Sequence, residues 1–161
     1  MQTIWITGGS SGIGFATAKE FIKNDWQVVI SSSNKKKLES AKKKLELNNN
    51  KNLVHAIVCD ISSKNNVDET INSIEKNIGK IDIALLNASA YSPNKNQIID
   101  ISNYELLVDV NIKGTLYCVN KLKDVMKNRN NTIAIISSPL GYRGWPTAGA
   151  LSLIHISEPT R

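Results

Sequence analysis

The chain has 161 residues, of which 41% are hydrophobic and 21% are charged, and its formal net charge at pH 7 is +6. This length predicts a single domain, and this composition excludes a disordered chain. No apolar run reaches the ~20 residues that span a bilayer, and residues 1–6 show no basic segment or cleavage site. We therefore expect a cytoplasmic protein with no membrane partner.

Short runs rich in β-branched residues alternate with stretches of helical spacing, which predicts a parallel α/β sheet. The expected strands are residues 3–7, 27–31, 53–59, 81–87 and 132–137, and the expected helices are residues 12–24, 35–47, 64–78 and 103–127. The third helix buries a face that contains Val67, Ile71, Ile74 and Ile78. Ser102 and Glu105 have the spacing of a capping box, which predicts the start of the fourth helix. The Asn-rich residues 48–52 predict a surface turn.

The positive charge is concentrated in the second expected helix, which contains Lys35, Lys36, Lys37, Lys42, Lys43 and Lys44. Its apolar side is Leu38, Ala41 and Leu45, so the lysines are expected to form a solvated face. Nucleic-acid binding, the alternative that this charge raises, is less favoured. Cys59 and Cys118 lie in apolar stretches and are expected to be reduced core thiols, so we expect no disulfide and no metal site.

A glycine-rich turn joins the first expected strand directly to the first helix, with the sequence Thr7-Gly8-Gly9-Ser10-Ser11-Gly12-Ile13-Gly14. Gly8 would permit a tight turn, Gly12 would let the backbone approach a pyrophosphate, and Gly14 would let the helix pack closely on the strand. The helix N-terminus adds N–H groups and a favourable dipole for an anion. Any strand-to-helix turn can use glycine, but this arrangement favours a dinucleotide site.

The end of the second expected strand carries hydroxyl groups where NAD-binding folds usually place an Asp or Glu that holds the ribose 2′-OH. The sequence there is Ser31-Ser32-Ser33-Asn34-Lys35, and the first carboxylate is Glu39. The hydroxyls together with Lys35 could accept a 2′-phosphate. We therefore predict NADP(H) in preference to NAD(H).

Several motifs in chain order resemble those of the short-chain dehydrogenase/reductase family, in its branch with shorter subunits, over residues 1 to about 150. They are Thr7, Gly8, Gly12 and Gly14; Asp60 within Cys59-Asp60-Ile61-Ser62; Asn87-Ala88-Ser89; Asn111-Ile112-Lys113-Gly114; and Ile136-Ser137-Ser138. Ser89 departs from the pattern, because the family has Gly there. The resemblance implies a Rossmann-type doubly wound parallel sheet with five strands in the order 3-2-1-4-5, lacking the C-terminal part of the fold.

The resemblance also implies hydride transfer between a nicotinamide and a small carbonyl or alcohol substrate, with NADP or NAD as cofactor. The implied cofactor-binding residues, including the serines at the second strand, are Thr7, Gly8, Ser10, Ser11, Gly12, Ile13, Gly14, Ser32, Ser33, Asp60, Ile61, Asn87, Ala88 and Ser89. The implied catalytic residues are Ser138, which would orient the substrate oxygen, and Asn111, which would help to hold a proton-relay water. Taken singly, Asp60 could cap a helix, Asn87 could close a turn and Ser138 could be a strand-end hydroxyl.

The resemblance ends at Ala150. The family's catalytic Tyr and Lys would fall at Leu151 and His155, and neither residue can perform that role. Residues 151–161 resemble the translation of a transposase sequencing adapter, and they lack the Lys and Asn that the rest of the chain uses heavily. We therefore expect residues 151–161 to be foreign to the natural protein and residues 1–150 to be the N-terminal part of one dinucleotide-binding domain.

Two further expectations follow for the chain as written. It should be catalytically inactive and prone to aggregation through its exposed fifth strand, whereas a full-length parent should be a homo-oligomer, as is common in the family. The alternatives are a dinucleotide-binding module without catalysis, which the same fold can support, and the absence of any functional protein of this length.

Overall fold

The computed structural model describes residues 1–47, 53–91 and 101–139. They form a parallel five-stranded sheet with the strand order β3-β2-β1-β4-β5. The strands are β1 (Thr3–Thr7), β2 (Gln27–Ser32), β3 (Val54–Val58), β4 (Ile81–Leu86) and β5 (Thr132–Ile135). The predicted Rossmann-type topology is confirmed, and the predicted strands agree with the observed ones to within two residues at each end.

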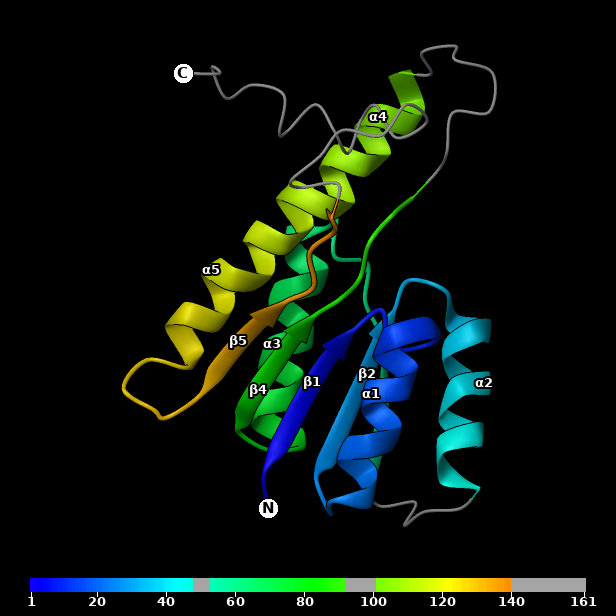
Figure 1. The fold of residues 1–161 in the computed structure, drawn as a ribbon. Coiled ribbons are helices and arrows are strands. Elements are labelled where there is room, and N and C mark those ends of the chain that lie inside the picture. Colours follow the sequence, from blue (N-terminus) through cyan, green and yellow to red (C-terminus); the bar gives the residue numbers. More distant parts are fainter. Residues whose placement is uncertain (48–52, 92–100, 140–161) are drawn as a thin grey trace.

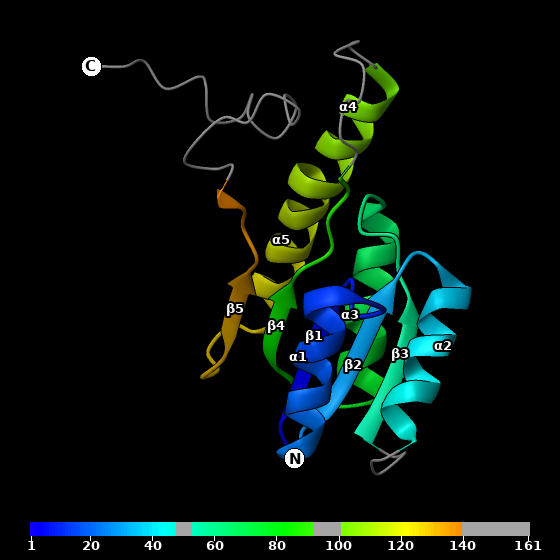
Figure 2. The same cartoon turned by 45° about the vertical axis from the view of Figure 1, so that its right-hand side comes forward.

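Helices cover both faces of the sheet (Figures 1 and 2). The helical segments are α1 (Gly12–Lys23), α2 (Lys35–Glu46), α3 (Lys64–Asn77), α4 (Ile101–Leu107), the π-helical η2 (Val108–Gly114) and α5 (Thr115–Val125). Helices α1 and α2 lie on one face, and α3 and α5 lie on the other. The last helix runs from β5 past the carboxyl ends of the strands, so its α4 end overhangs that edge of the sheet (Figure 1).

Side chains that alternate along the central strands build two separate cores, because successive strand residues point to opposite faces. Ile4 and Ile6 of β1 pack with the α1 and α2 side, whereas Trp5 packs with the α3 and α5 side. Every residue of β1 is buried, as expected for a central strand with both faces covered. The Trp5 indole is fully buried and donates from Nε1 to Ser31 Oγ at 3.1 Å, which satisfies its polar group.

The predicted face of α2 is confirmed, and that of α3 is confirmed except at Ile78, which is the C-cap and is half-buried. Leu38, Ala41 and Leu45 are the buried residues of α2, and Val67, Ile71 and Ile74 are buried in α3 together with Thr70. Both helices begin at a side-chain cap, since Asn34 accepts from the Lys37 N–H and Ser63 accepts from the Asn66 N–H.

The predicted start of the last helix is wrong. Ser102 lies inside α4, which already includes Ile101, so Ser102 and Glu105 are exposed residues of a helix surface and do not form a capping box. The helix also changes character at Val108–Gly114, where a π-helical segment separates α4 from α5. The expected turn at residues 48–52 and the expected foreign segment at residues 151–161 lie outside the described residues.

None of the described helices combines the length and the apolar character needed to cross a membrane.

Candidate cofactor-binding site

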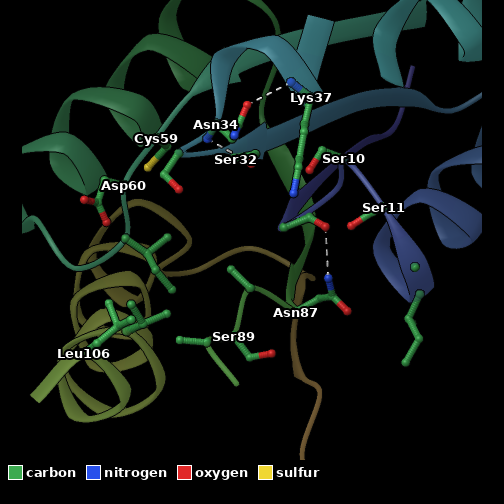
Figure 3. Close-up of a pocket in the computed structure, with 18 residues that line it drawn as sticks. Ser10, Ser11, Ser32, Asn34, Lys37, Cys59, Asp60, Asn87, Ser89 and Leu106 are labelled. Carbon is green, nitrogen blue, oxygen red and sulfur yellow. Dashed lines mark hydrogen bonds between the residues drawn. The ribbon is translucent and has the colours of Figure 1, made fainter. Parts of the chain in front are cut away.

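A cavity of about 630 Å³ opens at the carboxyl ends of the strands (Figure 3). The strand order reverses between β1 and β4, and ligands of open α/β sheets bind at such a switch point. Of the predicted cofactor residues, Thr7 and Gly14 do not line the cavity. All the others do, namely Gly8, Ser10, Ser11, Gly12, Ile13, Ser32, Ser33, Asp60, Ile61, Asn87, Ala88 and Ser89.

The glycine turn leaves room for a ligand at Gly12. This residue has φ +54°, and a Cβ placed on it would meet no atom within 4 Å, so its backbone faces open space on the cavity wall. Helix α1 begins at Gly12 itself, and its N-cap residue Ser11 makes no side-chain cap hydrogen bond. The backbone N–H groups of its first turn are therefore available to an anion, which fits the pyrophosphate of a dinucleotide.

Gly8 has a positive φ of +65°, which fits its predicted tight turn, and Gly9 and Gly14 serve packing. A Cβ on Gly14 would lie 2.7 Å from both Asn87 Nδ2 and Gly8 O, and a Cβ on Gly9 would lie 2.7 Å from the Ile30 side chain of β2. Gly14 thus permits close packing, but against Asn87 and the turn and not against the strand as predicted. Gly9, to which the sequence analysis assigned no role, is the residue that lets the turn lie against β2.

Thr7 acts from behind the turn. Its buried hydroxyl accepts from the backbone N–H groups of Asn87 at 2.9 Å and Ala88 at 3.0 Å. In return, Asn87 Nδ2 donates to Thr7 O at 3.1 Å and Gly8 O at 3.3 Å. These contacts fasten the loop after β4 to the glycine turn, so Thr7 positions the cofactor site from outside the cavity.

Asp60 and Ile61 line the cavity at the end of β3. Asp60 Oδ1 accepts from the Ser62 N–H at 3.0 Å and from the Ser62 hydroxyl at 2.7 Å. Ser63 is the cap of α3, so the alternative that Asp60 caps this helix is wrong.

The two cysteines are buried thiols. Cys59 lines the cavity next to Asp60, and burial raises the pKa of its thiol. Burial also raises the pKa of Cys118, to about 12. Both cysteines are free thiols, protonated at pH 7, and contribute packing to the core.

Asn111 holds the loop after β4 from the helix that overhangs it. Its Oδ1 accepts from the Ala90 N–H at 2.8 Å and its Nδ2 donates to Ala90 O at 3.0 Å. Asn111 lies in the middle of the π-helical segment, a helix type often found at functional sites. Its backbone carbonyl accepts from the Thr115 hydroxyl at 2.9 Å.

Ser138 lies beyond β5 and is not among the residues that line the cavity. The chain reaches it after Ile136, whose N–H donates to Leu86 O at 3.0 Å and continues the pairing of β5 with β4. The structure therefore places Ser138 beyond the carboxyl end of β5, at the same edge of the sheet as the cavity.

At the end of β2, the cavity is lined by Ser32, Ser33, Asn34 and Lys37. Lys35, the predicted phosphate partner, is absent from this wall and lies 4.0 Å from Glu39 in an exposed ion pair. Lys37, two positions later on α2, lines the wall instead. Asn34 caps α2 and accepts from the Lys37 N–H at 3.0 Å, so Lys37 lies in the first turn of this helix.

Among the described residues that line the cavity, only Lys37 and Asp60 carry a charge at neutral pH, and no carboxylate lies at the end of β2. No group of three or more His, Cys, Asp or Glu residues in the described part of the chain could hold a metal ion. The combination of an open glycine turn, a free helix N-terminus and this polar wall fits a dinucleotide.

Comparison with known proteins supports this assignment. The family model of short chain dehydrogenases matches residues 2–152. An uncharacterised oxidoreductase of Staphylococcus saprophyticus is 29% identical over 126 residues, which cover 78% of this chain and 53% of that protein. A mouse 3-ketodihydrosphingosine reductase is 32% identical over 143 residues, which cover 86% of this chain and 43% of that protein.

Solved structures show the same fold. A short chain dehydrogenase from Bacillus anthracis has a TM-score of 0.86 at 22% identity, over 96% of this chain and 63% of the other. An actinorhodin polyketide ketoreductase with NADPH has a TM-score of 0.86 at 20% identity, over 96% of this chain and 60% of the other. The chain thus spans little more than half the length of several relatives that it matches. Most of the predicted motif residues line one cavity, and the family model matches nearly all of the described residues. The chain therefore belongs to the short-chain dehydrogenase family of oxidoreductases.

Proposed function

We propose that this chain is the dinucleotide-binding part of an oxidoreductase that uses NADP(H) in preference to NAD(H) and acts on a small carbonyl or alcohol substrate. The observation that carries this proposal is the cavity at the switch point, where an open glycine turn faces a wall of hydroxyls without a carboxylate at the end of β2. The mouse reductase and the ketoreductase with NADPH support the reaction class and the cofactor.

Residues at different positions in the cavity would contact different parts of the dinucleotide. The turn at Gly12 and the first N–H groups of α1 would hold the pyrophosphate, Asp60 and Ile61 would contact the adenine, and Ser32 and Ser33 would face its ribose. When bound, the nicotinamide supplies or accepts the hydride. Ala88 and Ser89 would flank it on the loop that Asn111 holds in place. Ser138 would orient the substrate oxygen.

A fluorescence titration of the chain with NADPH tests the proposal. Gly12→Ala should weaken NADPH binding at least tenfold, because its methyl group would enter the space that the pyrophosphate needs. Asp25→Ala is a matched control, since Asp25 also has a positive φ, at 57°, but lies in the turn between α1 and β2. Both variants strain the backbone, yet only Gly12→Ala should lose affinity. An unmodified chain that binds neither NADPH nor NADH contradicts the proposal.

A second candidate function is dinucleotide binding without catalysis. The observation that favours it is the sequence at Leu151 and His155, which stand where the family has its catalytic Tyr and Lys. On either proposal, the chain as written reduces no carbonyl compound. Measurable NADPH oxidation above a control without protein, across a panel of aldehydes and ketones, would refute this.

Sequencing of the source locus across the codons for residues 146–161, from a direct amplicon without a transposase-made library, separates the two candidates. A Tyr followed by a Lys four codons later would support the enzyme and identify residues 151–161 as foreign. Codons for Leu151 and His155 in the genome would support the binding module. For the parent enzyme we also propose a cytoplasmic location. We further propose that it is a homo-oligomer, because Ile101, Val108 and Leu116 of the last helix are exposed apolar side chains.

A further inference from the structure

We propose that the outer face formed by α1 and α2 docks on a membrane surface that contains anionic phospholipid. The contact is peripheral, and it involves neither the cofactor cavity nor the reaction, so it goes beyond the proposed function. It replaces the expectations that the lysines of α2 form a solvated face and that the protein has no membrane partner.

The positive charge of the helices lies on one face of the sheet. Helices α1 and α2 cover that face, whereas α3 and the long helix formed by α4, η2 and α5 lie on the other side (Figures 1 and 2). The first two helices contain eight lysines and three carboxylates, a net charge of +5, and the segments on the other side contain five lysines and six carboxylates, a net charge of −1. An anionic surface would therefore attract the protein and orient α1 and α2 toward it.

The lysines of α2 follow a seven-residue repeat. The five residues from Lys35 to Glu39 recur in the same order from Lys42 to Glu46. Seven residues make about two helical turns, so equivalent positions of the two repeats lie on nearly the same side of the helix. The first lysine of each repeat pairs with the carboxylate four residues later, since Lys35 lies 4.0 Å from Glu39 and Lys42 lies 3.6 Å from Glu46. Both carboxylates of α2 therefore lie on one flank, together with their partners.

The other lysines of α2 lie away from that flank. Lys36, Lys43 and Lys44 are exposed, and within the described part of the chain no carboxylate pairs with them. Lys36 and Lys44 line a groove of about 510 Å³ between α1 and α2, which Phe15 of α1 also lines. Lys19 follows Phe15 by four residues, so it lies on the same side of α1. Lysines of both helices thus belong to one continuous basic surface.

An exposed leucine lies on the same side of α2 as these lysines. Lys36, Ser40, Lys43 and Leu47 recur at intervals of four, three and four residues, so they share the outer side of the helix, opposite its buried side chains. Leu47 is the C-cap of α2 and is 77% exposed. An aliphatic side chain beside lysines suits the boundary of a bilayer, where lysines contact the headgroups and the leucine contacts the acyl chains.

The composition of this face favours a bilayer over a nucleic acid. Proteins that hold single strands stack the bases on aromatic side chains, but both phenylalanines of α1 are half-buried and α2 has no aromatic residue. Proteins that read a duplex insert a helix or a β-ribbon into its groove, whereas α2 buries Leu38, Ala41 and Leu45 in the core of the domain. A broad basic surface with one exposed leucine instead fits the plane of a membrane.

Flotation with lipid vesicles tests the proposal, because vesicle-bound protein rises in a density gradient and self-associated protein does not. The probes are vesicles of phosphatidylcholine with about 30% phosphatidylserine and vesicles of phosphatidylcholine alone. The chain should float with the anionic vesicles and stay behind with the neutral ones. Raising the salt concentration should release it from the anionic vesicles, since the attraction is screened.

Two triple variants remove the same net charge from opposite sides of the molecule. One carries Lys36→Gln, Lys43→Gln and Lys44→Gln, and the other carries Lys76→Gln, Lys123→Gln and Lys127→Gln. The first should weaken binding to the anionic vesicles at least tenfold, because each lysine near such a surface contributes about fivefold. The second should weaken it by less than about twofold. All six side chains are exposed, so both variants should melt at the temperature of the unmodified chain, as circular dichroism checks.

Leu47→Ser separates a bilayer from other polyanions, because it leaves the net charge unchanged. It should weaken binding to the anionic vesicles severalfold and leave binding to a DNA duplex of about 20 base pairs unchanged, since duplex binding depends on phosphate contacts.

Three results would overturn the proposal. The first is an unmodified chain that does not float with the anionic vesicles. The second is an equal loss of binding in the two triple variants, which would mean that net charge acts without regard to the face. The third is tighter binding to the duplex than to the anionic vesicles together with an unchanged Leu47→Ser variant, which would identify a nucleic acid as the partner.

Discussion

Glu75 is the carboxylate with the most partners in the described structure. It accepts from Arg129 Nη2 at 2.9 Å and Nη1 at 3.3 Å, from the Ile81 N–H at 2.8 Å, and lies 3.3 Å from Lys80 Nζ. Its side chain is only 11% exposed. Burial would raise its pKa, but the bonds from Arg129, Ile81 and Lys80 outweigh burial and lower it. Glu75 thus joins α3 to the start of β4 and to the turn before β5.

Glu75→Gln should lower the free energy of unfolding by about 1–3 kcal/mol at pH 7, because it removes a charged partner of Arg129. Since the pKa of Glu75 is lowered on folding, its contribution is fully present above about pH 5 and declines as the pH falls below its usual ~4.3. Urea unfolding at pH 7 and at pH 3 should therefore show a smaller difference between the two proteins at pH 3. An equal difference at both pH values would contradict this linkage.

Asp109→Asn is the control for Glu75→Gln. Asp109 pairs with Lys113 at 2.7 Å on the helix surface, where both side chains are about half exposed, at 45% and 54%. Exposed pairs of this kind contribute little, so the change should cost less than about 0.5 kcal/mol.

The hydroxyl of Thr7 supports a second prediction. Thr7→Val keeps the shape of the side chain but leaves the N–H groups of Asn87 and Ala88 without their acceptor. The free energy of unfolding should fall by about 1–3 kcal/mol, and NADPH affinity should fall with it, because the loop after β4 loses its attachment. Thr7→Ser restores the acceptor and should recover most of both quantities. A valine variant as stable as the serine variant would show that the hydroxyl is dispensable.

At the scale of elements, the bond between Asn111 and Ala90 joins the π-helical segment to the loop after β4. Asn111→Ala should accelerate amide hydrogen exchange at Ala90 and weaken NADPH binding severalfold, since the loop that flanks the cavity loses its anchor. Asn120→Ala changes the same side chain at an exposed position of α5 and should alter neither quantity. Unchanged exchange at Ala90 in the Asn111 variant would refute the anchoring role.

The sequence predicted the elements well because their periodicities are strong, as in the buried residues of α2 and α3. It did not predict the π-helical segment, since apolar spacing hardly distinguishes one wider turn within a long helix. It placed a capping box at Ser102, because a favourable spacing also occurs inside helices. For the site, the glycine turn and Asp60 follow from motifs. That Lys37 lines the cavity and Lys35 does not depends on the rotation of α2 about its axis, which the packing of Leu38, Ala41 and Leu45 sets.

At the scale of the whole molecule, β5 is an edge strand of the described sheet and pairs with β4 alone. Ile135 and Ile136 are 53% and 44% exposed there, and unpaired apolar edges promote association.

The chain as written should therefore self-associate, as measured by light scattering against concentration. Ile135→Lys should reduce the scattering. Val58→Lys, at a 48% exposed position on the opposite edge strand β3, should reduce it less, because Val58 lacks an exposed apolar neighbour. An equal reduction of the scattering by Ile135→Lys and Val58→Lys would show that self-association does not depend on the β5 edge.

The bond between Thr7 and Asn87 joins residues 80 positions apart. The glycine turn is synthesised early, after β1. The cavity also needs β4 and the loop that follows it, and β4 is synthesised only after three other strands and the helices between them. Closing so long a loop costs entropy that grows with the logarithm of its length. The contacts that a nucleotide would make with the loop after β4 can offset that cost only once β4 has paired with β1. On the proposed function, a dinucleotide that contacts both the glycine turn and the loop after β4 would stabilise chains that have already assembled both halves of the sheet, so its capture during synthesis would report that β4 has paired with β1.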